Sequence, residues 1–477
     1  MAVLDKNVLI FKYFEEICEI PHGSYHEEKI ADYVENIAIE NDLSYQRDDM
    51  NNIIIFKDAT KGYEDHEPII LEGHMDMVNE KNNDSDHDFD NDPLDLYIKD
   101  GFLRARGTTL GADDGCGVAY MLALLTDKNV KHPPLECIFT VQEEVGLYGA
   151  DGLDVRSLKG KRFIGLDSET EGETCTSSSG GCEVYIKKPI QGEDNESPVY
   201  TLEVKGLLGG HSGEYIDKGR GNANKIAGRI LYHLLMNGID VRLIEINGGL
   251  KDNAIPRECV VSFASESDRD DIYNIVEKCS QDIAVELEIG DPGFEVNLFD
   301  EECDVCITAK DSEAIISIIY LGYNGLMEKS QTIPGLTILS LNMGVVKTYD
   351  DYVEIHYSIR SPLESARLEL CHQLKLIASL FNASVEMSGQ YPGWNYDPHS
   401  QMRKQFKDFY KAYTGKELKE VATHGGLETG IFKNKIPDLD IVTMGPNMAD
   451  IHTPDERLEI KSFLSTYNLL VKFIETL

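Results

Sequence analysis

The sequence predicts an α/β protein with a mixed sheet that carries helices on both faces, and a large α+β region interrupts this domain. Residues 1–185 alternate short apolar strands with helices, and residues 391–477 return to the same alternation. Between them, residues 186–390 twice follow the order strand, helix, strand, strand, helix, strand. Apolar strands separated by helices are typical of a sheet that is buried on both faces.

Apolar runs and helical periodicity identify the elements of the outer two segments. In the first segment we expect, in order, Asn7–Glu19 (helix), His26–Asn41 (helix), Asn51–Phe56 (strand), Pro68–Gly73 (strand), Gly115–Thr126 (helix), Leu135–Val141 (strand) and Arg162–Asp167 (strand). In the last segment we expect a helix over Met402–Thr414, a strand over Leu439–Gly445 and a closing amphipathic helix from Ile460. The two segments together form one domain, 1–185 and 391–477.

The middle region, 186–390, is predicted to contain two similar halves, at about residues 186–292 and 303–390. The elements of the first half are Tyr200–Lys205, Lys225–Met236, Val241–Ile246, Cys259–Ala264, Asp270–Ser280 and Ile283–Ile289. Those of the second half are Asp304–Ala309, Ser312–Leu326, Leu336–Met343, Tyr352–Arg360, Leu363–Phe381 and Ala383–Met387. The repeated order favours a duplicated α+β unit, although unrelated segments of this class often share it.

The composition excludes several classes of partner. The 477 residues include 84 acidic and 45 basic side chains, a formal net charge of -39, which repels both nucleic acid and anionic lipid. No segment approaches the roughly 18 apolar residues of a membrane helix, and the N-terminal segment is typical of a first helix, not of a signal peptide. The ten cysteines have no disulfide framework, so we expect reduced thiols and a cytoplasmic protein.

Polar side chains follow four of the predicted apolar strands, at the point where each strand ends. They are His74 with Asp76, the neighbouring pair Glu143 and Glu144, Asp167 and, after the last strand, His452. Each one alone could be an ordinary polar strand end. Open α/β sheets, however, place their ligand sites at the carboxyl ends of strands, so we expect these residues to share a site.

A glycine-rich turn, residues 107–115, adds Asp113 and Asp114 at the start of a predicted helix. Acidic residues stabilise helix N-termini, but one carboxylate is enough for a cap. Two aspartates in such a turn favour a carboxylate that is shared by two metal ions. Together with the strand-end imidazoles and carboxylates, they supply enough nitrogen and oxygen donors for two zinc-like ions without a cysteine.

Short motifs in one order extend over nearly the whole chain. They are GHMDMV, RGTTLGADDGCG, QEEVGLYGA, LDSETEGE, GGHSG, NAIPRE and IHTPDE. In these motifs the sequence resembles the two-zinc aminoacylase–dipeptidase metallopeptidases, in particular the bacterial aminoacyl-histidine dipeptidases, or cytosol non-specific dipeptidases. The resemblance implies a zinc-exopeptidase-like catalytic domain, 1–185 and 391–477, interrupted by a lid domain, 186–390.

The resemblance also implies two divalent ions per chain, zinc with cobalt or manganese as substitutes. His74 and Asp167 would hold one ion, Glu144 and His452 the other, and Asp113 would bridge the two. The bridging aspartate of the family usually precedes a cis peptide bond, so we expect one between residues 113 and 114. A cis bond outside proline costs about 3 kcal/mol and is confined to sites that require it.

Glu143 would be the general base and Asp76 would orient His74, again by resemblance. A hydroxide shared by the two ions would attack the peptide carbonyl, and Glu143 would move its proton to the leaving amine. Glu144 would be bound to a cation. Glu143 can then ionise beside it without the usual repulsion between neighbouring carboxylates.

Three residues of the lid region match the family's substrate-binding positions: His211, Asn253 and Arg360. His211 would help to stabilise the oxyanion, and the other two would bind the terminal carboxylate of the substrate. A surface histidine and a solvated arginine are the alternatives. His424 and Glu428 also match the family, without an assigned role.

The implied reaction is hydrolysis of unblocked dipeptides, such as Xaa-His or β-alanyl-histidine, with broad side-chain tolerance. The alternatives are deacylation of N-acyl amino acids at the same metal site and a non-catalytic binding protein. We expect a small dipeptide as partner, no nucleic acid and no membrane. A homodimer is left open.

Overall fold

The structure, a computed structural model, describes residues 3–333 and 335–477 and divides into two compact units. The first unit runs to Ser177 and continues over Trp394–Ala422 and Leu427–Leu477. The second unit contains Ser178–Gly393 and the short segment Thr423–Gly426. The sequence placed the boundaries at 186 and 390 and did not anticipate this short segment.

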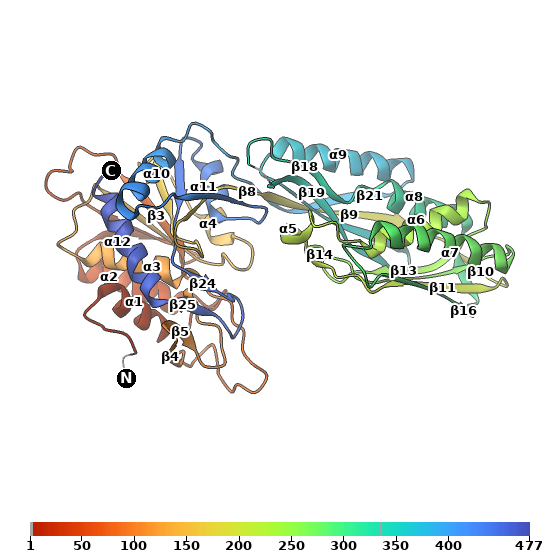
Figure 1. Ribbon diagram of the computed structural model, residues 1–477, viewed down its shortest axis with the longest axis horizontal. Coiled ribbons are helices and arrows are strands. Elements are labelled where there is room, and N and C mark those ends of the chain that lie inside the picture. The colour runs from red at the N-terminus through yellow and green to blue at the C-terminus, as the bar shows by residue number, and fades with distance from the viewer. Residues whose placement is uncertain (1–2, 334) are drawn as a thin grey trace. The chain divides into compact units, whose positions relative to one another are not determined.

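A mixed six-stranded sheet forms the centre of the first unit (Figure 1). Its order is β1 (Ser44–Arg47), β2 (Ile53–Lys57), β6 (Leu135–Thr140), β3 (Ile69–His74), β7 (Arg162–Gly165) and β23 (Asp440–Thr443). β6, β3, β7 and β23 are parallel, whereas β1 and β2 are antiparallel. The carboxyl ends of four parallel strands therefore meet at one edge of the sheet.

Helices cover both faces of this sheet, as the sequence predicts. One face belongs to a core shared with α1 (Leu9–Cys18), α2 (Glu28–Glu40), α3 (Ala112–Thr126), α10 (Gln401–Thr414) and α12 (Ile460–Ile474). On the opposite face Phe163 of β7 contacts Phe432 of α11 (Glu428–Lys435), with ring centroids 5.3 Å apart, and α11 packs against α4 (Tyr148–Gly152). Burial on both sides explains why the central strands are largely apolar.

Smaller strand groups complete the first unit. One has the order β24 (Met448–Ala449), β25 (Arg457–Glu459), β5 (Phe102–Ala105) and β4 (Leu96–Lys99), and β8 (Glu173–Ser178) pairs with β22 (Lys419–Thr423). The loop between β24 and β25 contains His452. No helix in the described part of the chain has both the length and the apolar character that crossing a membrane requires.

The second unit is built on a nine-stranded sheet. Its order is β16 (Glu295–Glu301), β11 (Val199–Lys205), β15 (Cys259–Ala264), β13 (Arg242–Gly248), β19 (Thr337–Thr348), β20 (Tyr352–Ser361), β9 (Gly180–Pro189) and β21 (Ser384–Tyr391), with β18 (Gly325–Lys329) also paired to β19. The order is symmetric about the contact between β13 and β19. On each side of it the second, third, first and fourth strands of a half follow one another outwards.

The first strand of the second half differs from the prediction at Asp304–Ala309. Only Val305–Ile307 is a strand (β17), and it pairs with β10 (Gly192–Asp194) outside the large sheet. Its expected place is taken by β9, which precedes the whole first half in the chain. β9 is ten residues long and pairs with both β20 and β21. The first half is therefore inserted between the first strand and first helix of the second half.

The strand predicted at Ile283–Ile289 is also wrong, because α7 (Arg269–Glu286) continues through most of it. The buried residues of α7 are Ile272, Val276, Cys279 and Ile283, at helical spacing. Packing of this stripe favours a longer helix over a turn and a strand. The following strand is β16.

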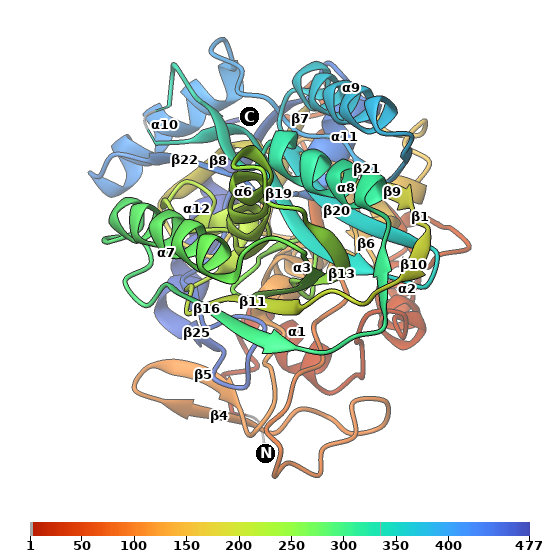
Figure 2. The same cartoon turned by 90° about the vertical axis from the view of Figure 1, so that its right-hand side faces the viewer.

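Four helices cover one face of the nine-stranded sheet (Figures 1 and 2): α6 (Ala223–Met236), α7, α8 (Ala309–Leu321) and α9 (Glu364–Leu380). In β9 the alternate residues Cys182, Val184 and Ile186 belong to this core. Glu183 and Tyr185 therefore lie on the opposite, polar face. Short elements, β12 (Gly210–His211), α5 (Ser212–Tyr215) and β14 (Ala254–Ile255), complete the unit.

Candidate metal centre

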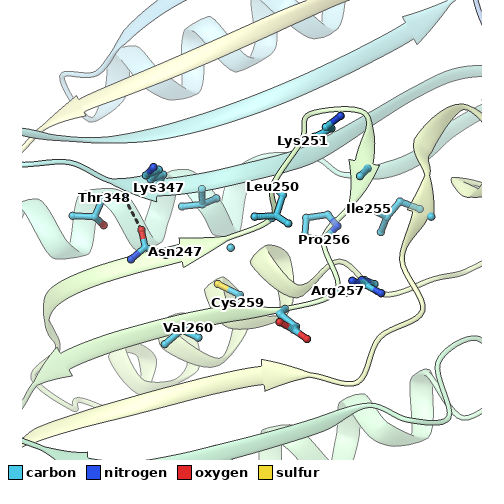
Figure 3. A pocket seen from close by; sticks show the side chains of 16 residues that line it. Asn247, Leu250, Lys251, Ile255, Pro256, Arg257, Cys259, Val260, Lys347 and Thr348 are labelled. Atoms are coloured by element: carbon cyan, nitrogen blue, oxygen red, sulfur yellow. Dashed lines mark hydrogen bonds between the residues drawn. The ribbon is translucent and has the colours of Figure 1, made fainter. Parts of the chain in front are cut away.

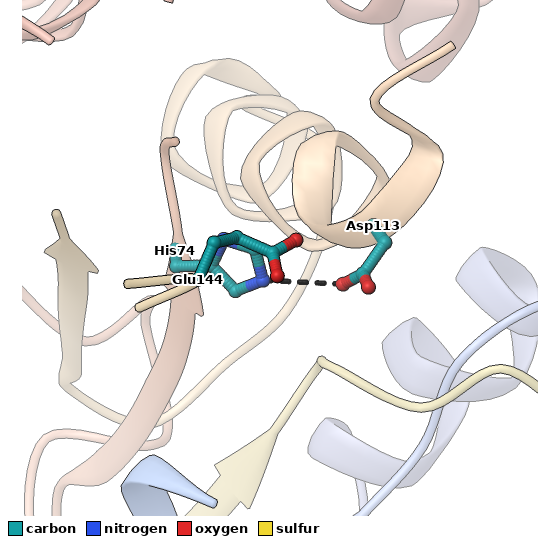
Figure 4. Close-up of side chains that lie close together, drawn as sticks. All are labelled: His74, Asp113 and Glu144. Atoms are coloured by element: carbon teal, nitrogen blue, oxygen red, sulfur yellow. Dashed lines mark hydrogen bonds and ion pairs between the residues drawn. The ribbon is translucent and has the colours of Figure 1, made fainter. Parts of the chain in front are cut away.

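The carboxyl ends of the parallel strands bring most of the predicted ligands together in the first unit. His74 is the last residue of β3, Glu144 follows β6, Asp167 follows β7, and His452 lies in the β24–β25 loop. Asp113 lies in the first turn of α3. His74, Asp113 and Glu144 each offer a ligand atom within 4.8 Å of the others (Figure 4).

Asp113 lies between the two histidines, with one oxygen directed to each. Its Oδ1 is 3.1 Å from Nε2 of His74, and its Oδ2 is 3.2 Å from Nε2 of His452. His452 Nε2 also lies 2.9 Å from Oε1 of Glu144. This is the arrangement expected of a carboxylate that bridges two cations, each with one imidazole.

The charged groups of the centre shift one another's pKa values. Burial works against the charged forms, but the two histidines still lower the pKa of Asp113. In return, Asp113 and Asp76 raise the pKa of buried His74 well above its ordinary value, and Asp113 and Glu144 raise that of His452 to about 10. The carboxylates therefore require positive charge beside them, which protonated imidazoles or metal ions can supply.

The donor set fits two divalent ions. Ligands of a tetrahedral ion with bonds of about 2.0–2.2 Å lie roughly 3.3–3.5 Å apart, close to the contacts around Asp113. Two imidazoles and three carboxylates are nitrogen and oxygen donors suited to zinc, cobalt or manganese. Burial, together with the nearby carboxylate of Asp113, raises the pKa of Asp167 well above its ordinary value, as expected for an uncompensated carboxylate beside a cation site.

Asp76 holds the turn that carries the two glutamates. Its carboxylate accepts hydrogen bonds from the backbone N–H of Glu143 (3.0 Å) and of Glu144 (3.3 Å), and from the hydroxyl of Ser24 (2.8 Å). The ring of His74 is closer to the backbone carbonyl of Asp76, 2.9 Å from Nδ1, than to its carboxylate, 3.6 Å away. Asp76 thus contacts both His74 and the glutamate turn.

Glu143 differs from its neighbour in its surroundings. Its side chain approaches neither histidine within hydrogen-bonding distance among the described contacts, whereas that of Glu144 contacts His452. Burial, Glu428 and Glu144 raise the pKa of Glu143 well above its ordinary range, against the opposing effect of His74. A carboxylate with a raised pKa is a stronger base than an ordinary carboxylate, which suits a group that accepts and returns a proton.

The turn before α3 is fixed by Glu456, four residues after His452. The carboxylate of Glu456 accepts hydrogen bonds from the backbone N–H groups of Leu110 (2.6 Å), Gly111 (3.1 Å) and Ala112 (2.8 Å). Gly111 adopts a left-handed conformation with φ 67°. The peptide bond between Asp113 and Asp114 is cis, as the resemblance implies.

Asp114 is fully buried beside two glycines. A Cβ atom on Gly73 or Gly117 would approach Oδ2 of Asp114 to 2.2 Å or 2.4 Å. The other oxygen accepts the N–H of Gly117 (3.0 Å). These glycines in GHMDMV and GADDGCG therefore leave room for the aspartate side chain.

Glu428, for which the sequence predicted no role, lies in the first unit near Glu143 and His74. Its Oε2 accepts the hydroxyl of Thr140 (2.6 Å), and Glu72 lies beside it. Burial raises the pKa of Glu72 to about 7. Burial and the neighbouring Glu72 raise the pKa of Glu428 well above its ordinary value. The two carboxyls thus favour a shared proton.

The three predicted substrate residues lie together in the second unit. His211 of β12 pairs with Ala254 of β14, and the N–H of Ser212 donates to the carbonyl of Asn253 (2.8 Å). A Cβ on Gly213 would approach both the His211 ring, at 2.9 Å, and the guanidinium of Arg360, at 3.6 Å. The imidazole of His211 and the guanidinium of Arg360 therefore lie near one another, and the backbone of Asn253 adjoins this cluster.

His424, in the short segment 423–426, is placed beside this cluster. Its Nδ1 lies 2.8 Å from Oγ of Ser179, and its Nε2 lies 2.6 Å from Oγ of Ser340. Burial and the guanidinium of Arg360 lower the pKa of His424 to about 4. The ring is neutral at pH 7 and holds the segment against β19.

A pocket of about 740 Å³ also lies in the second unit (Figure 3). Its lining includes Leu250, Ile255, Pro256 and Val260, and also the cationic residues Lys251, Arg257 and Lys347. His211, Asn253 and Arg360 are not among its lining residues. The pocket therefore does not coincide with the cluster of predicted substrate residues.

Several contacts in the centre were not predicted from the sequence. Ser24, Thr140 and the carboxylate of Glu456 act through hydrogen bonds to residues far away in the chain. Glu456 was the one with a signal, because it is the last residue of the motif IHTPDE. Hydroxyls such as Ser24 have no distinguishing pattern.

The chain is similar to known proteins over nearly its whole length. Residues 70–476 match the peptidase family M20/M25/M40. The chain is 38% identical over 470 residues to the cytosol non-specific dipeptidase of Escherichia coli (strain K12), covering 98% of this chain and 97% of that protein.

Solved structures give the same result. The structure is similar to aminoacylhistidine dipeptidase from Vibrio alginolyticus, with a TM-score of 0.91, 36% sequence identity, and coverage of 98% of this chain and 96% of that one. The aminopeptidase PepT from Bacillus cereus, at 18% identity and a TM-score of 0.58 with 99% of both chains covered, shares the fold. The chain belongs to the peptidase family M20/M25/M40.

Proposed function

We propose that this peptidase hydrolyses unblocked dipeptides at a centre of two divalent metal ions. The observation that carries the proposal is the position of Asp113, with one oxygen 3.1 Å from His74 and the other 3.2 Å from His452. The names of the relatives in Escherichia coli and Vibrio alginolyticus support a dipeptide substrate. The first of these names also supports action in the cytosol.

Five residues would hold the ions: His74 and Asp167 one ion, Glu144 and His452 the other, with Asp113 shared. Bound zinc, cobalt or manganese would lower the pKa of a water molecule and polarise the peptide carbonyl. The turn fixed by Asp76 keeps Glu144 at the ions and Glu143 beside them.

Glu143 would act as the general base and then as the general acid. Its carboxylate takes a proton from the attacking water and gives it to the nitrogen of the leaving amine. Its surroundings raise its pKa, which makes the carboxylate a stronger base for this exchange. Water is added across the peptide bond, and a free carboxylate and a free amine result.

The cluster in the second unit would recognise the substrate. We assign Arg360 and Asn253 to the terminal carboxylate and His211 to the oxyanion that forms at the attacked carbonyl. Tyr391 supports this assignment, because its hydroxyl lies 3.2 Å from a guanidinium nitrogen of Arg360 and fixes the position of that side chain.

The test compares Ala-His, its amide and Ala-Ala-His as substrates of the metal-loaded enzyme. We expect kcat/KM to be highest for the free dipeptide. Loss of the charged contact should cost the amide about 2–4 kcal/mol, roughly 30- to 700-fold. Arg360→Ala should remove most of this preference, whereas Arg269→Ala, an exposed arginine of α7, should keep it.

Other outcomes separate the alternatives. Equal rates on all three peptides would contradict the dipeptide assignment. Faster cleavage of N-acetyl amino acids would indicate a deacylase. Activity that survives removal of all metal by a chelator, checked by elemental analysis, would contradict the metal centre itself.

A further inference from the structure

A second group of metal-binding side chains lies in the second unit, on the polar face of its sheet. It consists of Glu183 of β9, His356 of β20 and Asp252 of the loop between β13 and β14. Each offers one ligand atom within 4.8 Å of the other two, and all three are half-buried. The proposed hydrolysis uses none of them.

The imidazole of His356 has one ring nitrogen that forms no hydrogen bond with the described residues. Its Nε2 is buried and has no hydrogen-bond partner among the described residues. This nitrogen lies 3.6 Å from Oε2 of Glu183, which is too long for a hydrogen bond. The distance is close to the roughly 3.3–3.5 Å that separates two ligands of one tetrahedral ion.

Tyr185 positions both of these ligands. Its ring is stacked on the His356 ring, with centroids 3.9 Å apart and an angle of 20° between the planes. Its hydroxyl donates to Oε2 of Glu183 at 2.6 Å. Fixed ligand orientation of this kind is typical of metal sites.

The two carboxylates lack a basic partner. In the described part of the chain, neither Glu183 nor Asp252 forms an ion pair with a lysine or arginine. The nearby Lys187 is directed to Glu354 and Glu386 instead, at 3.6 Å and 3.4 Å. A doubly charged cation would neutralise the pair, and a neutral imidazole would complete a three-residue ligand set.

We propose that Glu183, Asp252 and His356 bind one divalent cation of the zinc or manganese class, with water at the remaining positions. One imidazole nitrogen and two carboxylate oxygens suit these ions better than calcium or magnesium, which prefer oxygen ligands alone. The site is independent of the metal centre in the first unit.

Such an ion would connect the β13–β14 loop to the sheet. Asp252 precedes Asn253 in the β13–β14 loop, and its carbonyl accepts the side-chain N–H of Asn342 at 2.7 Å. A bond from its carboxylate to an ion held by β9 and β20 would fix the loop at a second point. The ion would therefore order the segment that positions Asn253, whether or not the substrate is a dipeptide.

The experiment measures bound zinc in the full-length protein after equilibrium dialysis, by elemental analysis. We expect His356→Ala to bind one ion per chain fewer than the wild type. His372→Ala is the matched control, because His372 lies exposed on α9 of the same unit, and it should bind as many ions as the wild type. Glu183→Gln and Asp252→Asn, which preserve side-chain shape, should weaken zinc binding at this site at least tenfold.

A local readout is hydrogen exchange of the backbone amides in residues 247–258. Zinc should slow this exchange in the wild type. In His356→Ala, zinc should leave the exchange unchanged. Equal zinc content in wild type, His356→Ala and Asp252→Asn would overturn the proposal and leave His356 as a bridge between two carboxylates. Loss of one ion in a protein that cleaves no dipeptide would support this site and contradict only the proposed function.

Discussion

Glu143 and Glu144 follow β6 side by side, and their backbone N–H groups both donate to the carboxylate of Asp76. One acceptor therefore fixes the turn for both residues, while their side chains enter different surroundings. Glu144 contacts His452, whereas Glu143 lies near Glu428. In the proposed mechanism the adjacent pair would divide two tasks, Glu144 as a metal ligand and Glu143 as the group that moves the proton.

This difference predicts unequal effects of two matched substitutions. Glu143→Gln should bind as much zinc as the wild type and lose kcat by at least about 100-fold, in the range typical of a lost general base. Glu144→Gln should lose zinc, because an amide is a poorer ligand than a carboxylate. Elemental analysis and steady-state kinetics on the same preparations measure both effects. Equal loss of zinc in the two variants would contradict the general-base assignment.

At the scale of elements, the start of α3 depends on a residue from the end of the chain. Glu456 satisfies three N–H groups of the turn that precedes Asp113. It lies in the same loop as His452, so one segment contains a proposed ligand and also fixes the turn of Asp113, the proposed bridging residue. The side chain of Glu456 is 3% exposed, and loss of its acceptors would leave buried donors unsatisfied.

We therefore expect Glu456→Gln to destabilise the protein by about 1–3 kcal/mol. The variant places an NH2 group against backbone N–H donors, and zinc affinity should fall roughly 10- to 100-fold, as for other residues that orient ligands. Denaturant unfolding and zinc titration are the measurements. Asp455→Asn, at the exposed neighbouring position, is the control. An unchanged zinc affinity would show that the turn keeps its shape without the carboxylate.

The short segment 423–426 is a second element whose stability depends on one side chain. His424 lies between Ser179 and Ser340, and burial lowers its pKa to about 4. Its pKa in the unfolded chain is about 6.5. Between these pH values the unfolded state binds one more proton, so the free energy of unfolding decreases as the pH falls.

At pH 5 the free energy of unfolding should be lower by about 2 kcal/mol, because this pH lies about 1.5 units below the pKa of histidine in the unfolded chain, where the folded state still excludes the proton. His424→Gln lacks the titrating group. We expect the stability difference between wild type and variant to shrink by about that amount from pH 7 to pH 5. Denaturant unfolding of both proteins at the two pH values measures it. A constant difference would mean that His424 accepts a proton in the folded state.

For the whole molecule, the sequence predicted the fold class and the order of most elements. The central strands of the first unit are apolar because both faces of the sheet are covered, and this leaves a clear signal. The second unit shows the limit of prediction from the sequence. β9 joins the second half across an inserted first half, and no local pattern records which strand it will pair with.

In the candidate centre, too, some residues could be predicted from the sequence and others could not. His74, Asp113, Glu144 and His452 were expected together because each follows a strand end or opens a helix, and the structure brings them together. Their roles remain predictions. The group Glu183, Asp252 and His356 could not be expected, because its members are far apart in the chain. Glu456 belongs to the motif IHTPDE, but its contact with the turn before α3 could not be expected.

The sequence by itself determined the elements whose signal is local: apolar strands, helical stripes, the glycine-rich turn and the polar residues at strand ends. Only the tertiary structure decided the strand order of the second unit, the length of α7 and the contacts that fix Asp113. The physical reason is range. Periodicity and turn chemistry act over a few neighbouring residues, whereas strand pairing and buried hydrogen bonds depend on contacts that exist only after the chain has folded.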